Sequence, residues 1–455
     1  MHLNTTLQIS VKMKIVLHAI GGYDEVGRNM TCLEIGNEAI ILDMGIYLDR
    51  YVPLQDNIDE LSPQQLMQED AIPNDTKISH LRKKVKAIVL SHAHLDHIGA
   101  IPWLASHYNC PIFSTPYTIE ILKRMKKEKS FFELKNKLIT INPNSTYNLS
   151  RNIDIEFIHT THSIIQPSMV NISFPQGNIL YALDYKFDNH PIIGKKTNKK
   201  KLRKLGKGNT IALIIDSTNA EEEKKTFSES VAKEMLKDVL LGMETDKHGI
   251  IITTFSSHVA RLKSIFDIGK SLGRNIVFIG KSLHNYIAAA EKLEFIHFSE
   301  KAEIIKNAPA AKKRLKELQS KREEYIIVVT GSQGEPNAVL TKIVNEDIPF
   351  TLMPDDFVVF SCGVIPTPTI QANRKILEHK IHNKKARIFK DIHVSGHASR
   401  EDIRDLIKII SPRNIIPAHG DMQKLASVAA LASEMGYSLG KDIYILQNGQ
   451  HVSLD

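Results

Sequence analysis

The segment Ser91-His92-Ala93-His94-Leu95-Asp96-His97 carries three histidines and one carboxylate within six consecutive positions. An apolar run, residues 85–90, comes directly before it, and a helix-compatible run, residues 98–105, comes directly after it. This order predicts a buried strand, a tight loop and the start of a helix.

Imidazole and carboxylate groups are the usual nitrogen and oxygen ligands of zinc in proteins. In an extended loop, His92 and His94 should point to one side, whereas Asp96 and His97 on the following turn should point elsewhere. Two ligand groups with different directions predict two metal ions. The competing interpretation is a solvated loop that happens to be rich in histidine.

Length and composition indicate a soluble protein with more than one domain. At 455 residues the chain is too long for one ordinary hydrophobic core. No apolar run approaches the roughly 20 residues of a membrane span, and no secretory signal is evident. The three cysteines, Cys32, Cys110 and Cys362, lie far apart, which predicts buried thiols in a reducing compartment and a cytoplasmic protein.

A formal charge of +8 favours an anionic partner without naming it. Basic side chains crowd one polar stretch: Lys195, Lys196, Lys199, Lys200, Lys201, Arg203, Lys204 and Lys207. This stretch is either a solvated surface segment or a segment that contacts phosphate groups.

Further candidate ligands lie at or near the ends of predicted strands. Asp43 follows the apolar residues 39–42; alone it would be a turn residue, but near a histidine cluster it is a candidate to orient a ligand imidazole. Five other side chains are predicted to close short apolar strands: His162, Asp184, Asp216, His397 and His419. His162 suits a third zinc ligand, and a carboxylate such as Asp184 could bridge two ions.

Residues 225–390 alternate between helices and short apolar strands, which predicts a separate α/β domain with a parallel sheet. The acidic residues 221–223 are predicted to open a helix just before it. Ser256-Ser257-His258 and Thr330–Gly334 follow strands, where small polar residues and free backbone N–H groups can bind phosphate. Ordinary helix caps explain these two segments equally well.

Together, these segments resemble the β-CASP branch of the metallo-β-lactamase superfamily, and within it the ribonuclease J family, particularly its compact archaeal form. The metal motifs of the superfamily fall in the expected order on Asp43, on residues 92–97, and on His162, Asp184 and His419. The β-CASP motifs fall on Asp216 in Asp-Ser-Thr and on His397 in Val-Ser-Gly-His-Ala-Ser. Residues 21–30 and 330–336 resemble ribonuclease J more than they resemble the superfamily at large. One departure is that bacterial relatives carry a further C-terminal domain.

The resemblance implies a four-layer αβ/βα metallo-β-lactamase fold with an inserted α/β β-CASP domain. We expect the first part of the metallo-β-lactamase domain at residues 1–220, the β-CASP domain at 221–388, and the C-terminal part of the metallo-β-lactamase domain at 389–455. RNA would enter the cleft between the two domains.

The resemblance also assigns roles to individual residues. One zinc ion would be held by His92, His94 and His162, and the other by Asp96, His97 and His419. Asp184 would bridge the two ions, Asp43 and Asp216 would support the surrounding ligands, and Asp96, Asp184 and His397 would act in catalysis. A 5′-phosphate pocket would be built from Ser256, Ser257, His258, His393, Val394, Ser395, Gly396 and His397. Each subunit would bind two Zn²⁺, with Mn²⁺ as the alternative metal.

The implied activity is a processive 5′-to-3′ exoribonuclease that prefers 5′-monophosphate ends of single-stranded RNA, acts in RNA decay and maturation, and has endonuclease cleavage as a secondary activity. A homodimer with no membrane association is expected. The alternatives are an endoribonuclease of the polyadenylation-factor type, a DNA-directed β-CASP nuclease and a catalytically silent RNA-binding scaffold. The first usually carries N-terminal KH domains, for which the residues before Met13 are too few. A scaffold would lack a ligand, and every expected ligand is present.

Overall fold

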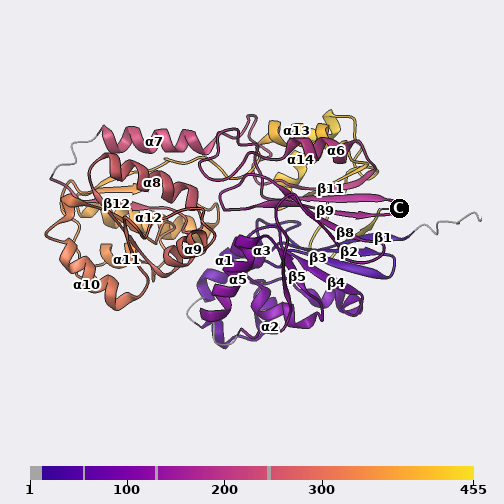
Figure 1. Cartoon of the computed structure of the whole chain (residues 1–455), viewed down its shortest axis with the longest axis horizontal. Coiled ribbons are helices and arrows are strands. Elements are labelled where there is room, and N and C mark those ends of the chain that lie inside the picture. The colour runs from indigo at the N-terminus through magenta and orange to yellow at the C-terminus, as the bar shows by residue number, and fades with distance from the viewer. Residues whose placement is uncertain (1–12, 55–56, 129–131, 243–246, 455) are drawn as a thin grey trace, which may run out of the picture.

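Three β-sheets organise the chain (Figure 1). The computed structural model describes residues 13–54, 57–128, 132–242 and 247–454, so residues 1–12 of the first expected domain lie outside the described part. Two of the sheets face each other as a sandwich, and the third belongs to a separate body at the other end of the molecule.

The first sheet has the strand order β19-β1-β2-β3-β4-β5-β6. Its strands are β1 (Ile15–Gly21), β2 (Met30–Ile35), β3 (Glu38–Leu42), β4 (Val85–Val89), β5 (Ile112–Ser114), β6 (Leu138–Thr140) and β19 (His451–Ser453). Strands β3 to β6 are parallel, whereas β19, β1, β2 and β3 pair antiparallel.

The second sheet has the order β18-β11-β10-β9-β8-β7. Its strands are β7 (Thr146–Asn148), β8 (Asp154–His159), β9 (Ser168–Phe174), β10 (Gly177–Ala182), β11 (Thr210–Asp216) and β18 (Asn414–Ala418). Strands β10, β11 and β18 are parallel, so the C-terminal part of the chain extends a sheet begun by the N-terminal part.

Alternating apolar residues of the two sheets form the centre of the sandwich. Leu17, Ile40 and Val89 of the first sheet share one buried cluster with Phe157 and Ile214 of the second. The outer faces are covered by helices, which completes four layers. Those beside the first sheet are α1 (Leu48–Tyr51), α2 (Pro63–Gln68), α3 (Leu95–Ile98), α4 (Ile101–Leu104) and α5 (Pro116–Glu128). Those over the second are α6 (Lys199–Gly206), α13 (Arg400–Ile410) and α14 (Met422–Glu434).

The third sheet is entirely parallel, in the order β14-β13-β15-β12-β16-β17. Its strands are β12 (Ile250–Thr253), β13 (Asn275–Ile279), β14 (Glu303–Ile305), β15 (Tyr325–Val329), β16 (Phe357–Phe360) and β17 (Arg387–Phe389). Central strands such as Ile-Ile-Ile-Thr are buried on both faces, as parallel strands between two helical layers require.

Helices α7 (Glu229–Leu241), α8 (Val259–Ser271) and α9 (Lys281–Lys292) pack on one face of this sheet. Helices α10 (Ala308–Leu318), α11 (Val339–Val344) and α12 (Pro368–Asn383) pack on the other. Short 3-10 helices complete the described elements: Val52–Leu54, Ile58–Glu60, Asp75–Leu81, Ala105–His107 and Arg322–Glu324. The expected four-layer fold with an inserted α/β unit is confirmed.

Three local expectations were wrong, the first being that His162 closes a strand, since β8 ends at His159. The acidic residues 221–223 do not open a helix; α7 begins at Glu229, because the Ser228 side chain caps it by accepting a hydrogen bond from the N–H of Ser230. His397 does not close a strand, since residues 390–398 form a loop between β17 and α13. None of the described helices is long and apolar enough to span a bilayer.

Candidate metal centre

Side chains with ligand chemistry converge where strands of the two sandwiched sheets end. Each lies just after a strand or on the short helix α3: Asp43 after β3, His92 and His94 after β4, Asp96 and His97 on α3, His162 after β8, Asp184 after β10, and His419 after β18. The fold therefore gathers residues that lie more than 300 positions apart in the sequence.

The first donor set joins His92, His94, His162 and Asp184. The Nδ1 atom of His94 lies 3.1 Å from Nε2 of His92 and 3.1 Å from Nε2 of His162. The Oδ2 atom of Asp184 lies 3.2 Å from Nε2 of His162 and 3.5 Å from Nε2 of His92. In a tetrahedral site with bonds of about 2.0 Å, neighbouring ligand atoms lie about 3.3 Å apart. The four donors therefore fit one ion.

The second donor set joins Asp96, His97, Asp184 and His419. Here the Oδ1 atom of Asp184 lies 3.1 Å from Nε2 of His97 and 3.4 Å from Nε2 of His419, and the Asp96 carboxylate lies 3.6 and 3.7 Å from the same two nitrogens. Among the described residues, none donates a hydrogen bond to the buried Oδ1 of Asp184. A buried carboxylate oxygen without a partner is costly, and a cation between the two donor sets would satisfy it.

Three ligand rings are oriented through their second nitrogen. His97 donates from Nδ1 to Oδ2 of Asp43 at 2.7 Å, and His162 donates from Nδ1 to the Gly396 carbonyl at 2.7 Å. His419 has its Nδ1 3.0 Å from Oδ1 of Asn29 and also accepts from the backbone N–H of Gly27 at 3.3 Å. Because Nδ1 of His97 and of His162 faces an oxygen acceptor, the Nε2 atoms of these two rings are directed toward the metal centre.

Burial and charge set the protonation states that metal binding requires. Burial and neighbouring rings such as His97 lower the pKa of His92 to about 4, and burial with nearby imidazoles holds the pKa of His94 well below its ordinary value. Burial opposes ionisation of Asp184, but His97 and His419 nevertheless hold its pKa well below the ordinary value. Against the effect of burial, surrounding carboxylates raise the pKa of His97 well above normal. A metal ion bound by His97 would oppose this rise, because it favours the neutral ring.

The backbone at this centre is held in an uncommon conformation. Asp43, Asp184 and His419 have φ of +59°, +49° and +59°, in the left-handed region. Few residues other than glycine adopt it, and such residues concentrate at functional sites. A Cβ atom on Gly45 would lie 1.6 Å from the carbonyl oxygen of Asp96, so the chain after Asp43 can pack against α3 only as glycine.

His397 faces the shared carboxylate from the loop before α13. Its Nδ1 donates to Oδ2 of Asp216 at 2.9 Å, and its Nε2 lies 3.9 Å from Oδ2 of Asp184. The other oxygen of Asp216 accepts from the backbone N–H of Thr218 at 2.9 Å. Although burial opposes protonation, Asp216 and Asp184 raise the pKa of His397 to about 9. The ring therefore lies beside the shared carboxylate with a raised pKa.

Some of the expected phosphate-binding residues lie at the metal centre itself. The Oγ atom of Ser257 is 3.1 Å from Nε2 of His94, which brings the inserted body to the ligands. The Gly396 carbonyl accepts from His162, and Ser395 Oγ accepts from the side chain of Asn219 at 2.7 Å.

The other expected phosphate-binding residues make their contacts with groups other than the metal ligands. His258 is buried and caps α8, with its Nε2 3.3 Å from Glu229. Val394 is buried, and burial lowers the pKa of His393 to about 3. The Oγ atom of Ser256 lies 2.9 Å from Oγ of Ser282.

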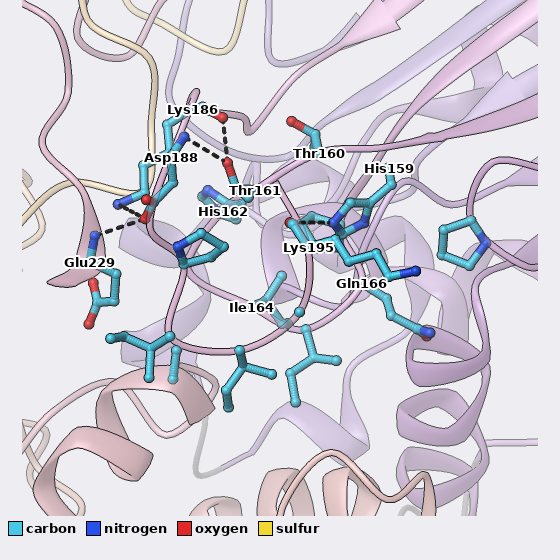
Figure 2. A pocket seen from close by; sticks show the side chains of 18 of the residues that line it. His159, Thr160, Thr161, His162, Ile164, Gln166, Lys186, Asp188, Lys195 and Glu229 are labelled. Atoms are coloured by element: carbon cyan, nitrogen blue, oxygen red, sulfur yellow. Dashed lines mark hydrogen bonds and ion pairs between the residues drawn. The ribbon is translucent and has the colours of Figure 1, made fainter. Parts of the chain in front are cut away.

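A pocket of about 290 Å³ adjoins His162 and is lined by both bodies (Figure 2). Isoleucines such as Ile164 form apolar walls, while Lys186, Asp188 and Glu229 add polar groups. Asp188 accepts hydrogen bonds from the backbone N–H of Glu229 at 2.8 Å, and His159 donates from Nε2 to the Lys195 carbonyl at 2.7 Å. The pocket thus lies behind a metal ligand and at the junction of the two bodies.

Two elements of the site were not identified from the sequence. Asn29 orients His419, although it lies within the Gly-Gly-Tyr-Asp-Glu-Val-Gly-Arg-Asn-Met segment that marked the family resemblance. Arg261 is completely buried, pairs with Glu229 at 2.5 Å, and donates to the Ile392 carbonyl at 3.0 Å. The only available signal for Arg261 was a charged residue in an apolar helix pattern.

The sandwich and the double donor set define a metallo-hydrolase, and comparisons with known families agree. Residues 23–187 match the metallo-beta-lactamase superfamily, and residues 247–378 match the ribonuclease J beta-CASP domain. Residues 381–446 match the Zn-dependent metallo-hydrolase RNA specificity domain.

Curated relatives narrow the assignment. A protein named ribonuclease J from Methanocaldococcus jannaschii is 43% identical over 445 residues, which cover 97% of this chain and 99% of the relative. Another, from Pyrococcus abyssi, is 45% identical over 444 residues, which cover 97% of each chain. The chain belongs to the ribonuclease J family of enzymes.

Two further matches have lower sequence identity to this chain. Ribonuclease J 1 from Streptococcus pyogenes is 32% identical over 98% of this chain and 76% of its own length. A solved structure of a protein of unknown function from Enterococcus faecalis has a TM-score of 0.63 at 17% identity, covering 97% of this chain and 100% of that one, which supports the fold alone.

Proposed function

We propose that this chain is a metal-dependent ribonuclease that degrades single-stranded RNA chiefly in the 5′-to-3′ direction, processively and from 5′-monophosphate ends. The observation that carries the proposal is the pair of donor sets that share Asp184, with His397 at their edge and Ser257 from the inserted body beside them. Endonuclease cleavage is a secondary activity in this proposal.

The proposed cofactor is two Zn²⁺ per chain, with Mn²⁺ as the alternative. One ion would be held by His92, His94 and His162, and the other would be held by Asp96, His97 and His419. Asp184 would contribute to both sites. When bound, two such ions supply Lewis acidity to the phosphate oxygens and a hydroxide nucleophile near neutral pH. Elemental analysis should find about two ions per chain, and removal by a chelator should abolish hydrolysis until the metal is restored.

The protein side chains would act on the substrate as follows. Asp96, whose side chain is 18% exposed, is the most open of the carboxylates at the centre and would accept a hydrogen bond from the attacking water and orient it. A new P–O bond forms as the bond to the leaving oxygen breaks. The protonated His397, held by Asp216, would deliver its Nε2 proton to that leaving oxygen.

A 5′-terminal phosphate would lie beside the centre, close to Ser257, Ser395 and Gly396. These residues come from two loops that meet beside the metal centre. A 5′ phosphate bound by both loops would therefore lie at a fixed distance from the bond that is cleaved. Ser256, His258, His393 and Val394 would then shape the pocket from behind. RNA with a 5′ triphosphate should be degraded more slowly than RNA with a 5′ monophosphate, and equal rates would contradict the pocket.

The decisive experiment is a time course with RNA labelled at its 3′ end, with a 5′ monophosphate, with and without a stable internal hairpin. Full-length RNA that gives way only to very short labelled fragments supports processive 5′-to-3′ digestion. Discrete internal products that form regardless of the 5′ group would instead support an endoribonuclease of the polyadenylation-factor type. A matched DNA oligonucleotide tests sugar selectivity, and light scattering tests the expected homodimer.

A further inference from the structure

Exposed positive charge is concentrated on one outer face of the sandwich. Seven exposed side chains form this surface, which we call the α6 basic face: Lys195, Lys196, Lys200, Arg203, Lys204, Lys207 and Lys408. Helix α6 and helix α13, which contributes Lys408, lie together over the second sheet (Figure 1). Gly206 packs so closely that a Cβ atom there would lie 2.0 Å from the Ile409 carbonyl, which brings the two helix ends together.

The cationic side chains of the α6 basic face are not neutralised by carboxylate side chains of the described residues. Within the described residues, none of the seven forms an ion pair. Two basic neighbours differ, since Lys201 pairs with Glu156 at 2.6 Å and Lys199 lies 4.1 Å from the centre of the Phe187 ring. The remaining charge is therefore available to an external anion.

Helix stability does not explain this charge. Lys200, Arg203, Lys204 and Lys207 follow i, i+3, i+4, i+7 spacing and share one face, where like charges repel. The helix dipole favours basic residues in the last turn, but the first turn of α6 is also basic, with Lys199, Lys200 and Lys201 and no acidic residue. The sequence thus keeps positive charge where it destabilises the helix.

The α6 basic face includes a hollow suited to phosphate groups. A shallow cavity of about 380 Å³ lies between the ends of α6 and α13. Its lining is Arg203, Gly206, Lys207, Lys408, Ile409 and Ser411, with no acidic side chain. Three cations around a concave surface match the charge of a phosphodiester backbone.

The segment before α6 is tied to the loop that carries a metal ligand. The Lys195 carbonyl accepts from His159, and the backbone N–H of Asn198 donates to the His159 carbonyl at 3.0 Å. His162 follows three residues later on the same loop. The α6 basic face therefore begins directly behind the metal centre.

We propose that the α6 basic face is a second RNA-binding surface, outside the catalytic cleft, that holds the backbone of long substrates. This proposal rests on the proposed ribonuclease function. The surface would raise the affinity for long RNA and would take no part in hydrolysis, so RNA too short to reach it would be bound and cleaved equally well without it.

The test replaces Lys200, Arg203, Lys204 and Lys207 with glutamine in one variant. The matched control replaces Lys312, Lys313, Lys316 and Lys321, four exposed lysines without ion pairs on or just after α10, so both variants lose the same charge. Binding is measured by fluorescence anisotropy in an Asp184→Asn background, which keeps the RNA intact. The ligands are single-stranded RNAs of about 6 and about 40 nucleotides, with heparin as a second polyanion.

The α6 variant should bind the long RNA about 10²- to 10³-fold more weakly near 0.1 M salt, and the slope of log K against log salt concentration should become shallower by about three. Its binding of the short RNA, and cleavage of that RNA with Asp184 restored, should match wild type, as should all results for the control. Unchanged long-RNA binding, or loss of heparin binding alone, would overturn the proposal. Failure of the wild-type protein to cleave even the short RNA would instead count against the proposed function.

Discussion

An Asp43→Asn substitution should weaken metal binding at the second donor set by about 10- to 100-fold. Asp43 accepts from the backbone N–H of Ser91 with Oδ1 and from Nδ1 of His97 with Oδ2, both at 2.7 Å. Asparagine keeps an oxygen for Ser91 but places an NH₂ group against His97. The ring would then carry its proton on Nε2, the atom that faces Oδ1 of Asp184 at 3.1 Å.

The expected loss corresponds to about 1.4–2.7 kcal/mol of binding free energy. Competition against a chromogenic zinc chelator, fitted to one affinity for each donor set, measures this loss. The ion held by His92, His94 and His162 should change much less, since none of these rings contacts Asp43. Hydrolysis at limiting metal should fall in parallel and recover when excess metal is added.

Asp75→Asn provides a matched control away from the metal centre. Asp75 is also a buried carboxylate that accepts from a histidine, Nδ1 of His107 at 2.8 Å, and from the hydroxyl of Tyr108 at 3.0 Å. Its replacement should lower the melting temperature and leave both metal affinities unchanged. The reasoning is refuted if Asp43→Asn binds both ions as wild type does, or if the control weakens metal binding equally.

Three further substitutions test other parts of the site. His397→Gln should slow hydrolysis by about 10²- to 10⁴-fold. Because the protonated ring is the active form, wild-type activity should fall as pH rises through the pKa of His397. A cation bound to Asp184 would oppose the rise of that pKa to about 9, so the fall in activity should lie between about pH 6.5 and about pH 9. A pH–rate profile should show this alkaline fall in the wild type and not in the variant. Arg261→Met should reduce the free energy of unfolding in urea by about 3–5 kcal/mol, because it leaves the buried Glu229 carboxylate without its guanidinium partner; a much smaller loss would contradict that role. Gly45→Ala should lower both metal content and melting temperature through its clash with the carbonyl of Asp96, and a fully metal-loaded variant would show that the loop can yield.

The sequence predicted best where a buried apolar strand stops at a polar residue. Asp43, Asp216 and His419 were all expected at strand ends and are found there, because β3, β11 and β18 are short apolar runs buried between layers. Such runs fix both the strand and the point where the chain reaches the edge of the sheet. The grouping of residues 92–97 followed from their spacing alone.

Predictions failed where tertiary contacts replaced local pattern. Strand β8 ends at His159, so His162 lies in a loop and not at the strand end. The backbone near His397 is occupied with other contacts, since Gly396 accepts from His162 and Ser399 bridges to Asn219. The Asn219 side chain is also engaged with this loop, since its amide donates to Oγ of Ser395 at 2.7 Å. Pairings across hundreds of residues, such as Asn29 with His419, leave no periodic signal in the sequence.

The order of the ligands along the chain has a consequence for its synthesis. His92, His94 and His162 leave the ribosome early, but His397 and His419 follow only after the whole third sheet has been translated. Domains tend to fold from the N-terminus as the chain emerges. Under the proposed function, a growing polypeptide is therefore harmless to the messenger being translated, and nuclease activity begins only when the last strand of the second sheet is added.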